Sequence, residues 1–309
     1  MMLAGVLRGR LRLFAASFRT SRDGRRGGGW RDLLFVGLFA ALSWLALTRL
    51  FERLALEQVA AVDAARVLGL VLTAAFVGLA VFDLHQAVSA LVLDSDLALL
   101  RAAPITPRVL AAHKLADALP ATGVLTVVLV GPALAGFARA YPLPGWSGAL
   151  LPLAVIALWL LSLTFGMSVA LPLVRRLPAL RVRESLAVIA TASLMLLWLM
   201  QAFVLPRVTE QVSGLVAPLV GLGRAWDAAL GLVLPPFWLA RALGGAALAG
   251  AGAEGATATW RLAGTIAMLA AFTAAGLALY LVTATRQLEP LLQSLARKSQ
   301  EVRAPLRTA

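Results

Sequence analysis

Long runs of apolar residues, separated by short charged segments, dominate the sequence. Six runs contain almost no Asp, Glu, Lys or Arg, and about 20 apolar residues suffice for a helix to cross a bilayer. Because the backbone in hydrocarbon must satisfy its own hydrogen bonds, and because alternating strand patterns are missing, the runs predict helices. The predicted spans are residues 33–51, 67–93, 118–138, 140–174, 185–206 and 262–285, and the fourth begins in a turn containing Pro142, Pro144 and Gly145.

Residues 207–260 are also apolar, but glycine and proline interrupt them repeatedly. The two apolar pieces, 211–223 and 228–240, have about 13 residues each, which is too short to span a bilayer. They favour re-entrant or interfacial helices, and an ordinary loop with a hydrophobic surface is the alternative. The predicted fold class is therefore an all-α integral membrane protein. It has six transmembrane helices, an N-terminal amphipathic interfacial helix, and re-entrant or interfacial helices between spans five and six.

The N-terminal segment predicts an amphipathic helix that lies in the headgroup layer. Leu3, Leu7, Leu11, Phe14 and Phe18 follow helical spacing, with arginines on a neighbouring stripe. Those arginines break any continuous apolar core, so the segment does not resemble a secretory signal peptide. The chain divides into a cytoplasmic amphipathic helix with a glycine-rich joint over 1–29, a transmembrane domain over 30–285, and a basic cytoplasmic tail over 286–309.

Composition and charge narrow the class of protein further. The chain is 61% hydrophobic and 14% charged, which excludes a water-soluble enzyme. It contains no cysteine and two histidines, so thiol catalysis and cysteine-based metal sites are excluded. Of the Lys and Arg residues, 20 fall on the side of the two termini and 8 on the other side. This bias places both termini in the cytoplasm and attributes the net charge of +13 to topology and anionic lipids rather than to nucleic-acid binding.

The segment between spans two and three predicts a short helix, a rigid corner between Pro104 and Pro107, and a second helix leading into span three. Asp94 or Ser95 can cap the first helix. Leucines and an isoleucine in this segment, placed on the cytoplasmic side and flanked by charges, are typical of a docking surface. Packing of the same side chains under the protein's own helix ends is the alternative.

The same segment resembles a motif of bacterial ABC-2 type exporter permeases. In that family, Ser-Asp followed by alternating hydrophobic residues, Leu, and a Pro-hydrophobic-Ser/Thr end forms the coupling helix that contacts the ATP-binding subunit. Here the pattern runs from Ser95 to Thr106, and residues 234–240 resemble a second stretch common before the sixth span. The resemblance implies ATPase-coupling roles for Asp94, Asp96, Leu97, Leu99, Leu100, Pro104, Ile105 and Thr106.

The resemblance implies the membrane subunit of an ATP-driven exporter in the bacterial cytoplasmic (inner) membrane. The sequence has no Gly-x-x-x-x-Gly-Lys-Ser/Thr phosphate loop, so we expect no enzyme activity or cofactor in this chain and ATP on a separate subunit. Because relatives can hold two such six-span halves, the expected partners include a second permease chain, identical or not, besides membrane lipids. The apolar spans suggest a hydrophobic or amphipathic substrate. A membrane-embedded lipid-modifying enzyme and an ion-coupled secondary transporter are the alternatives.

Few polar residues interrupt the predicted spans. The intramembrane candidates are Asp83, His85 and Gln201. A carboxylate inside a membrane is costly and often functional. Asp83 and His85 are two residues apart and do not share a helix face, so a structural role or a hydrated position near the cytoplasmic end is favoured over proton coupling or substrate contact.

Overall fold

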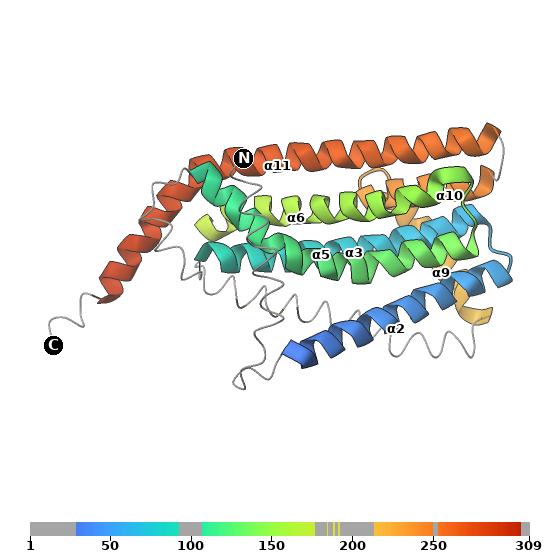
Figure 1. Cartoon of the computed structure of the whole chain (residues 1–309), viewed down its shortest axis with the longest axis horizontal. Coiled ribbons are helices and arrows are strands. Elements are labelled where there is room, and N and C mark those ends of the chain that lie inside the picture. Colours follow the sequence, from blue (N-terminus) through green and yellow to red (C-terminus); the bar gives the residue numbers. More distant parts are fainter. Residues whose placement is uncertain are drawn as a thin grey trace. The chain divides into compact units, whose positions relative to one another are not determined.

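The protein is all-helical where its structure, a computed structural model, describes it: residues 29–92, 107–176, 184, 188, 191, 213–249 and 253–303. Figure 1 traces these helices along the chain. The elements are α2 (Gly29–Leu56), α3 (Ala61–Val92), α5 (Pro107–Ala140), the 3-10 helix η2 (Gly145–Leu150), α6 (Leu151–Arg176), α9 (Ser213–Leu230), α10 (Pro235–Ala249) and α11 (Ala253–Arg303). The predicted all-α class is confirmed for these residues.

Four segments of the described helices are long and apolar enough to cross a membrane. They are Ala61–Val88, Thr122–Ala140, Trp146–Ala170 and Glu254–Arg286. They coincide with the second, third, fourth and sixth predicted spans, and the predicted turn before the fourth span is present at residues 141–144. The chain is therefore a multi-pass membrane protein.

The first and fifth predicted spans stay predictions. Residues 33–51 lie in α2, a continuous helix of 28 residues that is not among the four segments. Nearly all of 185–206 lies outside the described residues, as do the N-terminal segment 1–28 and the end of the predicted tail. Helix α11 continues past residue 285 to Arg303, so most of the predicted tail is helical.

Two short helices occupy the region where two short pieces were expected, but their boundaries differ from the prediction. Helix α9 has 18 residues and α10 has 15. The sequence predicts a break near Arg224 and Asp227, because these charged residues interrupt the apolar run. The actual break follows at 231–234, and α10 begins at Pro235, where the missing N–H costs nothing.

A four-residue turn joins α2 to α3. Gln58 adopts a left-handed conformation with φ 57°. The N–H of Gln58 donates to the carbonyl of Ala55, and the N–H of Val59 donates to the carbonyl of Leu54. These two bonds form a Schellman motif, which ends α2 and satisfies its last carbonyls.

The described chain forms two compact units. Unit 1 comprises Met1–Thr73, Val124–Pro152 and Met195–Leu262, and unit 2 comprises Ala74–Gly123, Leu153–Leu194 and Ala263–Ala309. In unit 1 the ring of Phe137 packs edge-on against Phe51 and stacks on Tyr141, with centroid separations of 5.6 and 5.2 Å. The Tyr141 hydroxyl donates to the carbonyl of Val59 at 3.0 Å, and burial raises its pKa to about 12. The hydroxyl therefore stays neutral and secures the turn after α2.

Two tryptophans that flank apolar segments lie together in unit 1. Trp146 and Trp260 pack edge to face, with ring centroids 5.4 Å apart. The hydroxyls of Ser147 and Thr259 are hydrogen-bonded beside them at 2.6 Å. The start of the fourth span and the start of the sixth are thus adjacent in unit 1.

In unit 2, α3 and α6 approach each other closely at Gly166. A Cβ atom added to this glycine would lie 2.7 Å from the Cβ of Asp83 and 2.9 Å from the backbone nitrogen of Leu84. Both distances are shorter than van der Waals contact, so only glycine permits this approach.

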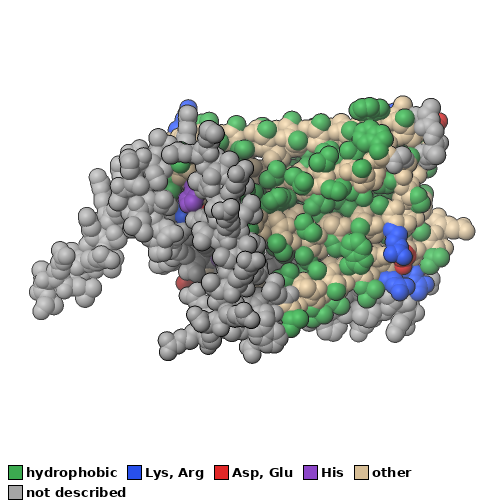
Figure 2. Space-filling model, viewed as in Figure 1, with side chains coloured by type: hydrophobic (Ala, Val, Ile, Leu, Met, Phe, Trp, Pro, Cys, Tyr) green, Lys and Arg blue, Asp and Glu red, His purple; other side chains and the backbone are tan. Residues whose placement is uncertain are grey.

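Large hydrophobic side chains are exposed along the helices, as Figure 2 shows for one face. Leu38, Val127 and Trp260 are each at least 60% exposed. A water-soluble monomer does not expose so much apolar surface, whereas a membrane protein presents it to lipid.

We expect Gly166→Ala to destabilise the protein. The added methyl group meets Asp83 and the α3 backbone, and overpacking of this kind costs about 1–3 kcal/mol. The matched control is Gly78→Ala on α3, where nothing lies within 4 Å of the added atom. Thermal unfolding in detergent should show a lower midpoint for Gly166→Ala and an unchanged or higher midpoint for Gly78→Ala. Equal midpoints would mean that the close approach is not a constraint.

Candidate functional site

The residues expected to contact an ATPase belong to the segment between α3 and α5. Asp94, Asp96, Leu97, Leu99, Leu100, Pro104, Ile105 and Thr106 all lie outside the described residues, and so does Gln201. The structure instead describes the helices on either side: α3 ends at Val92 and α5 begins at Pro107. Helix α5 therefore starts at the proline that the sequence predicted for its first position.

The two helices on either side of residues 93–106 contribute to one buried cluster in unit 2, which we call the inner core. Ala87 and Val88 of α3 and Leu110 and Ala111 of α5 are all buried in it. Its remaining members come from α6 and α11: Leu163, Met167, Ala170, Tyr280 and Ala284. The described helices on either side of residues 93–106 thus share one packed core.

A polar contact fixes the inner core as well. The Tyr280 hydroxyl, fully buried, donates to the carbonyl of Ala111 at 3.3 Å. Leu84, Leu115 and Leu281 pack around the cluster. Because well-packed interiors transmit displacement rather than absorb it, these four helix segments are suited to moving together.

Asp83 is fully buried in unit 2 and bonded to Ser162. The Ser162 hydroxyl donates to Oδ2 of Asp83 at 2.5 Å, which joins α3 to α6 beside Gly166. The other carboxyl oxygen, Oδ1, is buried without a hydrogen-bond partner among the described residues. His85 lies on another face of the same helix and is half-buried. The sequence analysis favoured a structural or hydrated position for Asp83, and the structure places it inside the protein rather than at a hydrated surface.

Unit 1 contains a group of charged side chains that the sequence analysis did not connect. Arg224 donates through Nε to Asp63 at 2.9 Å and through Nη2 to the second oxygen of the same carboxylate. Arg66 donates to Asp63 at 2.6 Å and to Asp227 at 3.3 Å. Arg241 donates to the carboxylate of Asp227 at 2.8 Å and to its backbone carbonyl at 3.2 Å. We call these five residues the arginine–aspartate network.

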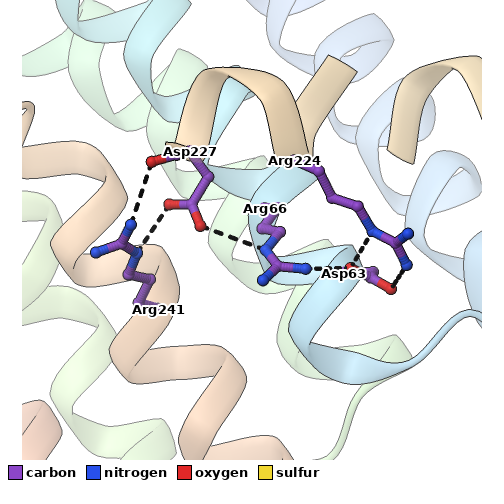
Figure 3. Close-up of polar contacts among 5 residues, drawn as sticks. All are labelled: Asp63, Arg66, Arg224, Asp227 and Arg241. Atoms are coloured by element: carbon purple, nitrogen blue, oxygen red, sulfur yellow. Dashed lines mark hydrogen bonds and ion pairs between the residues drawn. The ribbon is translucent and has the colours of Figure 1, made fainter. Parts of the chain in front are cut away.

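The network joins three helices, as Figure 3 shows. Asp63 and Arg66 lie one turn apart at the start of α3, Arg224 and Asp227 lie one turn apart on α9, and Arg241 lies on α10. The bond from Asp63 raises the pKa of the Arg224 guanidinium. Two carboxylates hold three guanidiniums, so α9 and α10 are attached to α3 by charge as well as by packing.

Two glycines make the network possible. A Cβ at Gly231 would collide with the Asp227 carbonyl and with the Arg241 guanidinium, at 2.3 and 2.5 Å. A Cβ at Gly223 would lie 3.2 Å from the Arg66 backbone, which is tighter than ordinary contact. The turn after α9 and the approach of α9 to α3 both depend on a missing side chain.

The sequence held a signal for this network. Between residues 211 and 253 the only charged residues are Arg224, Asp227 and Arg241. Three isolated charges in a strongly apolar stretch need partners, because an unpaired charge in a low-dielectric environment is costly. Arg224 and Asp227 find partners 161 residues away in the sequence, so spacing alone does not reveal their pairing, whereas Arg241 pairs with Asp227 within the stretch.

Known families, curated proteins and solved structures were compared with the chain, and none of them matches it. The site is therefore interpreted from its own residues.

We expect Asp227→Asn to weaken the attachment of α9 and α10. The amide leaves Arg66 and Arg241 without a charged acceptor, and we expect a cost of about 1–3 kcal/mol, below that of a fully buried pair because both arginines are partly exposed. The matched control is Glu254→Gln, which neutralises an exposed carboxylate that forms no ion pair within the part of the chain that the structure describes. Thermal unfolding and limited proteolysis near 231–234 should both show the Asp227 variant to be less stable. Identical behaviour of the two variants would mean that the network does not hold these helices.

Proposed function

We propose that this chain is the membrane-spanning permease subunit of an ATP-driven exporter of the ABC-2 type. In this proposal the protein resides in the bacterial inner membrane with both termini in the cytoplasm. A separate subunit binds and hydrolyses ATP, and a second permease chain, identical or not, completes the transport path. The substrate is hydrophobic or amphipathic and leaves the cytoplasm or the inner leaflet.

The observation that carries this proposal joins the sequence motif to the packing around it. Residues 93–106 match the family's coupling segment in pattern. Ala87 and Val88 of α3 and Leu110 and Ala111 of α5, which lie a few residues from this segment, are buried in the inner core together with α6 and α11. A push from a partner subunit on residues 93–106 would therefore reach helices that share one packed core.

The proposal also accounts for the distribution of charge. The described membrane-spanning segments contain few charged side chains, and Asp83 is covered by protein. Such a membrane interior supports a substrate that is itself apolar in part. The basic segments 1–32 and 286–309 then lie at the cytoplasmic surface, where anionic headgroups attract them.

We expect Leu97→Asp and Leu100→Asp to abolish coupling to the ATPase. A carboxylate in an apolar contact is left desolvated, which is enough to disrupt a small docking surface. The matched control is Leu232→Asp, which places the same charge on an exposed leucine in the turn between α9 and α10. Co-purification of a P-loop ATPase, and ATP-dependent transport, should fall at least about tenfold for the first two variants and stay unchanged for the control. Full retention of both by Leu97→Asp and Leu100→Asp would refute the coupling role.

Ion-coupled secondary transport is the second candidate, because the carboxyl group of Asp83, which is hydrogen-bonded to Ser162, is buried inside a membrane span. Under the exporter proposal the pair holds α3 against α6, and Asp83→Asn keeps an acceptor for Ser162. We therefore expect Asp83→Asn to transport at about half the wild-type rate or better, and transport to persist when the proton gradient is collapsed. Ser162→Ala serves as the control for the lost hydrogen bond. Complete loss of transport in a folded Asp83→Asn protein, with dependence on the gradient, would favour the secondary transporter.

A further inference from the structure

A shallow depression on unit 1 combines exposed guanidiniums with an exposed tryptophan. It has a volume of about 390 Å³ and is lined by Trp44, Leu45, Thr48, Arg49, Glu52 and Arg139. A second depression of similar size, lined by Ala55, Leu56 and Ala140, shares Glu52 with it. Helix α2 supplies most of both linings, and the end of α5 supplies the rest.

The arginines of this depression are held far more loosely than those of the arginine–aspartate network. Arg49 and Arg139 approach Glu52 at 3.9 and 3.6 Å, beyond hydrogen-bond distance, and their side chains are 59% and 71% exposed. In the arginine–aspartate network, by contrast, Arg66 bonds to Asp63 at 2.6 Å and Arg241 bonds to Asp227 at 2.8 Å. Both Arg49 and Arg139 therefore have donors to offer to an anion that enters the depression.

A buried hydroxyl adds an independent observation. Thr48 lines the depression and is 8% exposed, and its Oγ1 has no hydrogen-bond partner among the described residues. A buried polar group without a partner is costly, and it gains a hydrogen bond when a phosphate oxygen is bound beside it. Two guanidiniums and a hydroxyl are a suitable donor set for phosphate.

The position along the helices matches the headgroup level of a bilayer. The apolar span Thr122–Ala140 ends one residue after Arg139, and Glu52 lies in the last two turns of α2. Trp44 lies eight residues before Glu52, about 12 Å along the helix toward its apolar part, and is half exposed. Polar groups at the end of the span and apolar groups below it reproduce the profile of a phospholipid.

We propose that this depression is a binding site for a phospholipid whose headgroup carries an amine, such as phosphatidylethanolamine. Arg49, Arg139 and the Thr48 hydroxyl bind the phosphate. Glu52, which lies between the two arginines, binds the ammonium group and so favours the zwitterionic headgroup over phosphatidylglycerol. Trp44 and Leu45 pack against the glycerol and the upper acyl chain. The proposal needs a membrane-embedded chain and does not depend on the transport function.

The test uses the full chain, purified in detergent, depleted of lipid and titrated while bound lipid is counted by native mass spectrometry. The probes are phosphatidylethanolamine, phosphatidylglycerol, the chain-free headgroup glycerophosphoethanolamine, and inorganic phosphate. We expect one tight site for phosphatidylethanolamine and weaker binding of the other three probes.

The variants separate the roles of the lining residues. We expect the double variant Arg49→Gln with Arg139→Gln to weaken phosphatidylethanolamine binding by about tenfold, and Thr48→Val to weaken it by a smaller factor. Glu52→Gln should remove the preference over phosphatidylglycerol while retaining phosphate binding. The matched control is Arg53→Gln, an exposed arginine of the same helix that does not line the depression, and it should bind as the wild type does.

Three results would overturn the proposal. Equal affinities of the double variant and Arg53→Gln would mean that the site is elsewhere. Wild-type affinities for phosphatidylglycerol as high as for phosphatidylethanolamine would remove the role of Glu52. Binding of glycerophosphoethanolamine or phosphate as tightly as the lipid would identify a soluble anion as the ligand. Because both arginines are largely exposed, the variants should fold, and either single arginine variant replaces the double variant if its melting temperature falls.

Discussion

The pairing of charges in an apolar protein is the constraint on which this structure depends. In unit 1, two carboxylates hold three guanidiniums, and the bonds connect the first turns of α3 to two short helices that are not among the four candidate membrane-spanning segments. Hydrophobic packing alone gives short helices little preference for one position in a membrane, since lipid is as apolar as protein. Directional bonds to Asp63 and Asp227 supply that preference, and Gly231 leaves the space that they require.

The sequence predicts the helical class and four of the spans because apolar runs directly reflect the solvent around a helix. It also predicts the turn at 141–144 and the start of α5 at Pro107, since proline and glycine act locally. It does not predict the extent of α9, because Arg224 and Asp227 break the apolar pattern while their pairing keeps the helix intact. Nor does it predict that Asp83 meets Ser162, since contacts between helices depend on rotation about each helix axis, which a run of leucine and alanine does not specify.

The candidate sites also differ in whether they depend on a local sequence pattern or on contacts between distant residues. The coupling segment 93–106 is recognisable because its pattern is local, and the structure adds the inner core to which its flanks are fixed. The arginine–aspartate network and the depression at Glu52 are built from residues separated by roughly 90 to 180 positions, so folding alone brings them together. Both places combine arginines with carboxylates, but the distances between the paired atoms differ. In the arginine–aspartate network the guanidiniums bond closely to carboxylates, whereas the longer ion pairs of the depression leave N–H donors for a ligand.

The left-handed turn at Gln58 has a mechanical consequence. A residue other than glycine in this conformation is strained by roughly 1 kcal/mol, and the turn holds it through two backbone bonds and the anchored Tyr141 hydroxyl. With only four residues between them, the end of α2 and the beginning of α3 have no slack. A tilt of the end of α2 is therefore passed on to the beginning of α3, and the two helix ends move as one rigid element.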